Sequence, residues 1–150
     1  MGYQYEGDAG RQSSGKETIP LLLGRAMFGG FFLYNGVNHL LHTEAMAGYA
    51  KSKGVPFADL AVRGTGLLLI AGGLSLLTGY RPKLGAALIG TFLAGVSPSM
   101  HGFWGESEPG ERQNAMVHFA KNMALLGGTL LAAAEPEPWP YSAGRHSAAA

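Results

Sequence analysis

The sequence predicts an all-α fold: an integral membrane four-helix bundle with four transmembrane helices and both termini cytoplasmic. Four apolar segments of about 20 residues each fill the middle of the 150-residue chain and are long enough to cross a bilayer. Residues 64–79 and 84–100 carry no charge on any face, whereas the helices of a soluble bundle would each show a charged face. The four segments are residues 19–41, 60–80, 84–104 and 115–134.

These segments form one membrane domain, residues 18–134, between two polar ends. Residues 1–17 are polar and rich in Gly and Ser, and are expected to form a disordered N-terminal tail. Residues 135–150 are expected to form a C-terminal tail, because Pro136, Pro138 and Pro140 stop the last helix. The longest connection, residues 42–59, is expected to hold a short interfacial helix around residues 45–52.

Charge and composition exclude several classes of function. The net charge is +1 and Lys and Arg form no basic face, so no nucleic-acid partner is expected. The chain has no cysteine and therefore cannot form a disulfide or act alone as a dithiol redox enzyme. The positive-inside rule places both ends in the cytoplasm, since that side would hold Arg11, Lys16, Arg81, Lys83 and Arg145.

Some charged and aromatic residues are expected at the membrane surfaces. Arg25 lies near the cytoplasmic entry of the first segment and is expected to extend its guanidinium to the lipid headgroups. Tyr80, Trp104 and Trp139 are expected to be interfacial anchors.

Lys121 lies inside the last apolar segment. The purely apolar part of that segment, residues 123–134, is too short to cross a bilayer, so the span must include His118, Lys121 and Asn122. A charge near the bilayer midplane costs about 3 kcal/mol on insertion scales and usually faces the protein interior with a partner. Lys121 is therefore expected to face the interior.

Polar residues of all four segments are expected to meet in the extracytoplasmic half of the membrane. They follow helical spacing and comprise Asn35, Asn38, His39 and His42 in the first segment, Arg63 in the second, Ser97 and His101 in the third, and His118, Lys121 and Asn122 in the fourth. Other readings remain open: Asn35 and Asn38 could hydrogen-bond between helices, Arg63 could reach headgroups, and Lys121 could bind backbone carbonyls or a loop Glu.

A cationic and imidazole cluster without acids suits an electron-rich ligand. A quinone carbonyl, a lipid phosphate or a carboxylate would each accept a hydrogen bond from Lys121, Arg63 or a protonated His. Haem held by His39, His101 or His118 is a weaker alternative, because no spacing motif supports it. No metal site is expected and no catalytic residue is identified, since the His residues lack short ligand spacing and no nucleophile or acid-pair motif is present.

Small residues recur every four positions, which lets membrane helices approach closely. The pattern is typical of a compact bundle or of an intermolecular face. The sets are Ala26/Gly30, Ala71/Ser75/Gly79, Ala86/Gly90/Ala94 and Ala124/Gly128/Ala132.

Three stretches resemble the DoxX-like family of small four-helix bacterial membrane proteins. They are LGRAMFGGFFLYNGVNHL at residues 23–40, HGFW at 101–104 and MVHFAKNMALLGG at 116–128. The resemblance implies a multi-pass protein of the bacterial inner (plasma) membrane, and the family name comes from a subunit associated with a thiosulfate:quinone oxidoreductase. The family pattern commonly has a carboxylate in the second helix, where this chain has Arg63.

The sequence therefore favours a quinone- or lipid-binding accessory component of a membrane redox system. The alternative is a non-enzymatic assembly or anchoring subunit for another membrane protein. Expected partners are membrane lipid, a redox enzyme or other membrane protein, and a second copy of the chain.

Overall fold

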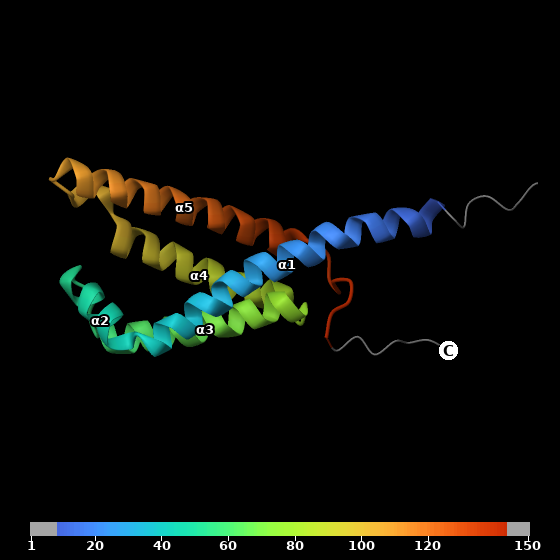
Figure 1. Cartoon of the computed structure of the whole chain (residues 1–150), viewed down its shortest axis with the longest axis horizontal. Coiled ribbons are helices and arrows are strands. Elements are labelled where there is room, and N and C mark those ends of the chain that lie inside the picture. The colour runs from blue at the N-terminus through green and yellow to red at the C-terminus, as the bar shows by residue number, and fades with distance from the viewer. Residues whose placement is uncertain (1–8, 144–150) are drawn as a thin grey trace, which may run out of the picture.

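The computed structural model describes residues 9–143, and this part of the chain is all-helical, as predicted. The helices enclose one main core and pack side by side in the order α1, α3, α4, α5 (Figure 1). Their bounds are α1 Ala9–Leu41, α2 Thr43–Ser52, α3 Ala58–Thr78, α4 Pro82–His101 and α5 Pro109–Ala134, with a short 3-10 helix η1 at Phe103–Gly105.

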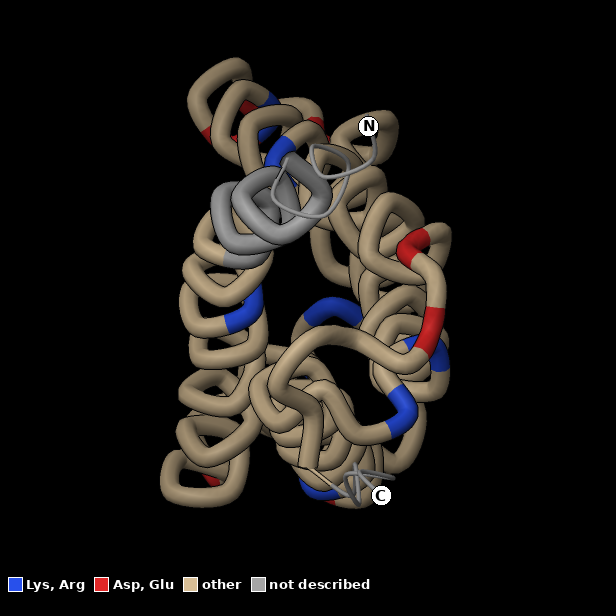
Figure 2. The backbone as a smooth tube through the Cα atoms, turned by 90° about the vertical axis from the view of Figure 1, so that its right-hand side faces the viewer, with Lys and Arg blue, Asp and Glu red and all other residues tan. Residues whose placement is uncertain are grey.

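Two of the helical stretches are long and apolar enough to cross a membrane: Ala58–Thr78 and Pro82–Gly105. Within the described residues, α1 and α5 do not meet that standard, because polar side chains interrupt their apolar runs. Seen end-on, most of the backbone is uncharged, and Lys, Arg, Asp and Glu stand at scattered positions (Figure 2), in keeping with a charged share of 14%.

The expected segment ends differ from the observed ones at both termini. α1 already begins at Ala9, inside the stretch expected to be a polar tail, while residues 1–8 lie outside the described part. The short helix expected in the longest connection is present as α2. It lies across one end of the bundle, at the left of Figure 1, and packs on α3 through Ala47, Ala50, Ala58 and Val62.

Four glycines allow α1 and α3 to form the largest helix interface. A Cβ atom added to Gly73 would lie 2.6 Å from the Leu33 nitrogen and 2.7 Å from the Gly29 oxygen. A Cβ added to Gly36 would lie 2.7 Å from the Gly66 oxygen. The two backbones are thus in direct contact at two points seven residues apart on each antiparallel helix.

The small-residue pattern expected to mediate this packing is not the one used in α1. Ala26 is exposed and the space beside Gly30 is open, whereas Gly29 and Gly36 face α3. In α4 the expected Gly90 does face α5, at ordinary contact distance from Thr129. The four-residue spacing was wrong for α1 because the antiparallel contacts recur every seven residues, which is two helical turns.

Arg25 corrects a second expectation, since its side chain is buried, with 6% exposed, instead of reaching the headgroups. α3 ends at Thr78, and the following Gly79 adopts a left-handed conformation, so carbonyls of the last turn lack their usual helical partners. Arg25 donates to the carbonyls of Leu76 (3.2 Å) and Leu77 (2.8 Å), and to that of Pro140 (2.7 Å).

The C-terminal segment packs on the same end of the bundle, so the expected tail is in part ordered structure. Trp139, expected to be an interfacial anchor, is 1% exposed and lies in the core with its ring 5.7 Å from the Arg25 guanidinium carbon. The Lys83 N–H donates to Glu137, and the Ala143 N–H donates to the Thr78 carbonyl. Backbone groups left unpaired at the end of α3 and at the start of α4 thus form hydrogen bonds with the segment 135–143. Residues 144–150 lie outside the described part of the chain.

We predict that Gly73→Ala lowers the free energy of unfolding by about 1–3 kcal/mol, because the added methyl group meets backbone atoms that cannot move aside. The measurement is thermal unfolding in detergent, followed by circular dichroism. Gly64→Ala on the same helix is the matched control, since nothing lies within 4 Å of its added Cβ. Equal stability of the two variants would contradict the close contact.

We predict that Arg25→Met destabilises the protein by about 1.5–3 kcal/mol, the usual range for hydrogen bonds to a charged group. Three carbonyls would lose their donor, and the C-terminal segment would separate from the bundle. Faster amide hydrogen exchange of residues 139–143 in the intact detergent-solubilised chain measures that separation. Lys83→Met, a substitution of an exposed residue beside the same segment, should leave this exchange rate unchanged.

Candidate functional site

A cavity of about 810 Å³ lies at the α2 end of the bundle, between α1, α2, α3 and α4. Its wall is mainly apolar and includes Met46, Leu68, Phe92, Val96 and Met100. Its polar lining residues are Asn38, His39, His42, Tyr49, Thr65, Thr91, Ser99 and His101. We refer to it as the α2 pocket.

His39 is held in the wall of this pocket by two contacts. Its Nδ1 lies 3.1 Å from the Thr65 hydroxyl oxygen, and its ring packs edge-on against Phe92 with centroids 5.9 Å apart. The Thr65 hydroxyl has two carbonyls of its own helix within hydrogen-bond distance, those of Ala61 (2.8 Å) and Val62 (3.0 Å). In the tautomer with its hydrogen on Nδ1, His39 donates to the Thr65 oxygen and Nε2 is an acceptor.

His101 links the pocket to α5. Its ring stacks on that of His118, with centroids 4.9 Å apart and planes inclined by 15°. The Lys121 ammonium lies 3.4 Å from Nδ1 of His118. Stacked rings in contact leave no room for a macrocycle between them, so His101 and His118 do not form an axial pair for haem.

The polar residues expected to form one cluster are therefore divided among several places. Asn38, His39 and His101 line the α2 pocket, and His118 and Lys121 adjoin it through the stacked rings. Asn35 donates to the Phe31 carbonyl of its own helix (2.7 Å), so this hydrogen bond stays within α1. Arg63 is exposed and does not line the pocket.

Lys121 was expected to face the interior, and the structure corrects this. Lys121 is exposed, whereas the next residue, Asn122, is 6% exposed and begins the face of α5 that continues through Thr129. Successive helical residues point about 100° apart, so packing through Asn122 turns Lys121 outward.

Sequence reasoning missed the contribution of α2 and of Thr65 to the pocket. Met46, Tyr49 and Ala50 stand at i, i+3 and i+4 and line the cavity with one face of α2. That spacing is the signal that could have identified the helix as a cover for a site. Thr65 offers no such signal, because only the packing of α1 on α3 brings it to His39.

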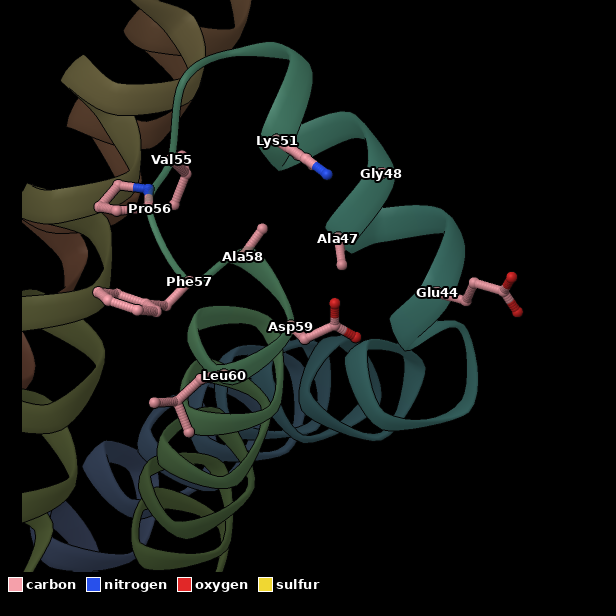
Figure 3. A pocket seen from close by; sticks show the side chains of 10 residues that line it. All are labelled: Glu44, Ala47, Gly48, Lys51, Val55, Pro56, Phe57, Ala58, Asp59 and Leu60. Atoms are coloured by element: carbon pink, nitrogen blue, oxygen red, sulfur yellow. The ribbon is translucent and has the colours of Figure 1, made fainter.

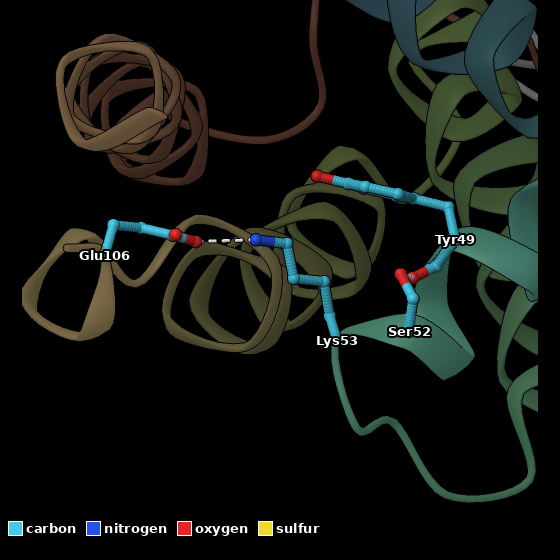
Figure 4. A network of polar contacts seen from close by, with 4 residues as sticks. All are labelled: Tyr49, Ser52, Lys53 and Glu106. Carbon is cyan, nitrogen blue, oxygen red and sulfur yellow. Dashed lines mark hydrogen bonds and ion pairs between the residues drawn. The ribbon is translucent and has the colours of Figure 1, made fainter. Parts of the chain in front are cut away.

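An ion pair stands at the same end of the bundle. Nζ of Lys53, just after α2, lies 2.6 Å from Oε1 of Glu106, just after η1 (Figure 4). The hydrogen bond from this ammonium to Glu106, supported by the charge of the carboxylate, raises the pKa of Lys53. The pair connects the α2–α3 connection to the α4–α5 connection.

A second hollow of about 650 Å³ lies on the outer side of α2, against the start of α3 (Figure 3). Lys51 and Asp59 extend beside it, while Phe57 and Leu60 point away. Within residues 9–143, no group of three His, Asp or Glu side chains is placed to hold a metal ion. The described residues of this hollow therefore include no metal site.

A family model described as DoxX matches residues 20–102, which is more than half of the chain. The match covers α2, α3, α4 and most of α1, and so includes every residue that lines the α2 pocket. It ends before α5, and therefore before the stretch 116–128. No curated protein and no solved structure matches the chain. On the family match, the chain belongs to the DoxX family.

Proposed function

We propose that this protein is a multi-pass protein of the bacterial inner membrane that binds a quinone in the α2 pocket, as an accessory component of a membrane redox system. The observation that carries the proposal is a large, mainly apolar cavity with an ordered imidazole in its wall. A volume of about 810 Å³ is in the range of cofactor-sized sites, roughly 300–1,000 Å³.

Four spans and cytoplasmic termini are part of the proposal. α3 and α4 meet the requirements of a span, and α1 and α5 pack alongside them in the same bundle. α1 and α5 also expose large apolar side chains, including Met27, Tyr34, Leu130 and Leu131. Such surfaces are favourable against lipid and unfavourable in water.

The polar groups of the pocket suit the two oxygens of a quinone or quinol. With Nδ1–H bound to Thr65, a neutral His39 accepts a quinol hydroxyl at Nε2, and a protonated His39 donates to a quinone carbonyl. Asn38, the residue before His39, also lines the pocket and supplies an amide donor, and the apolar wall accommodates the ring and the start of its tail. We propose that electrons pass between this quinone and a partner enzyme of the redox system.

A ligand could reach the pocket from the lipid phase. α5 contributes none of the lining residues, and it diverges from α1 and α2 toward this end of the bundle (Figure 1). α5 approaches α1 toward the opposite end of the bundle (Figure 1), where Gly128 faces the Phe28 ring. Because no residue of α5 lines the pocket, we propose this side as the entry for an apolar molecule.

We predict that Gly95→Phe weakens binding of a short-chain ubiquinone at least about tenfold, or ~1.4 kcal/mol. Gly95 lines the pocket and has open space where its Cβ would stand, so the phenyl ring would occupy the cavity without a clash at its base. Calorimetric titration of the detergent-solubilised protein measures the affinity.

Gly64→Phe is the matched control, because Gly64 is also open and exposed but lies outside the pocket. The proposal predicts unchanged affinity for this control. Quinone binding that is equal in both variants, or undetectable in the unmodified protein, would overturn it.

We predict that Glu106→Gln speeds amide hydrogen exchange in α2, because the ion pair with Lys53 helps to hold this helix over the pocket. The charge-exchanged variant Lys53→Glu/Glu106→Lys should restore slow exchange, and Glu108→Gln is the control. Because the pKa of Lys53 is raised in the folded state, the contribution is complete below the pKa of the unfolded lysine and is lost as pH rises through the folded value. Unchanged exchange in Glu106→Gln would show that α2 is held by its apolar contacts alone.

A further inference from the structure

His118 and Lys121 form a basic pair on α5 that the quinone pocket does not use. The described residues contain one ion pair, Lys53–Glu106, so no described carboxylate lies within ion-pair distance of Lys121. Lys121 is exposed, and the Lys121 ammonium donates to Nδ1 of His118. This contact places the His118 hydrogen on Nε2, and stacking on His101 holds the ring in place.

Contacts with an exposed tryptophan indicate the depth of this pair in the membrane. Trp104 is 64% exposed and stands at the end of the apolar stretch Pro82–Gly105. Its ring lies 6.0 Å from that of Phe119, which also packs against Phe103 at 5.6 Å. Exposed Trp side chains at the end of a span lie at the level of the headgroups. Phe119 directly follows His118, so the basic pair lies at the same level.

We propose that His118 and Lys121 bind the phosphate of an anionic membrane lipid, at a site beside the quinone pocket and separate from it. The Lys121 ammonium has hydrogens beyond the one directed at His118, and Nε2–H of His118 is a second donor. Phosphate oxygens are strong acceptors, and donation from an ammonium strengthens such bonds. A negatively charged headgroup also supplies the opposite charge that no described carboxylate provides to Lys121.

The membrane position of this site rests on the proposed function, but lipid and quinone binding can be measured separately. Native mass spectrometry of the full chain in detergent, with phosphatidylglycerol and phosphatidylcholine of identical acyl chains, reports which lipid is retained. The expected result is preferential retention of phosphatidylglycerol, reduced about fivefold in Lys121→Gln, as for loss of one basic residue at an anionic surface.

Three further variants make the assignment specific. Lys121→Arg keeps the charge and should retain phosphatidylglycerol. His118→Gln should weaken retention, because the glutamine amide does not place an N–H at the position of Nε2–H of His118. Lys51→Gln removes one charge from an exposed residue at the same end of the bundle and should have no effect. Equal retention in Lys121→Gln and Lys51→Gln would overturn the proposal.

Quinone binding and free phosphate complete the test. Lys121→Gln should bind short-chain ubiquinone normally, and Gly95→Phe should still retain phosphatidylglycerol. Loss of both ligands in Lys121→Gln would show that they share one site, and would overturn the separate lipid site. Millimolar inorganic phosphate should not displace the lipid. Complete displacement that depends on Lys121 would assign the site to a soluble anion instead.

Discussion

The rest of the structure depends on the direct backbone contact between α1 and α3. Gly29 and Gly36 meet Gly73 and Gly66, and any side chain at these points would force the helices apart. Arg25 precedes Gly29 by four residues and His39 follows Gly36 by three, so both stand on the face of α1 that approaches α3. The contact therefore brings Arg25 to the carbonyls of Leu76 and Leu77 at one end and His39 to Thr65 at the other.

The two ends of the bundle use this contact differently. At the Arg25 end, the C-terminal segment forms hydrogen bonds with Arg25, with the end of α3 and with the start of α4, and it places Trp139 in the core. At the His39 end, α2 covers an open cavity instead of filling it. The dense polar pairing and the cavity thus lie at opposite ends of the same helices.

The partners of the basic residues distinguish structural from functional roles. Arg25 is satisfied by three carbonyls and Lys53 by Glu106, so each holds two segments together. Among the described side chains, the hydrogen-bond partner of Lys121 is His118, and no carboxylate lies within ion-pair distance of Lys121. The proposed lipid site rests on this unpaired cation, whereas the pocket beside it is mainly apolar.

The sequence by itself determined the helices, the family and the positions of the polar stripes, because apolar runs and helical spacing are local properties of the chain. It also indicated α2, and it placed Asn38, His39 and His101 at one end. Only the tertiary structure decided that Arg25 binds Pro140, 115 positions away, that Trp139 is buried, and that Lys121 is exposed while Asn122 is buried. These outcomes depend on which faces of distant helices meet, and the close approach of two glycine pairs sets that geometry in three dimensions.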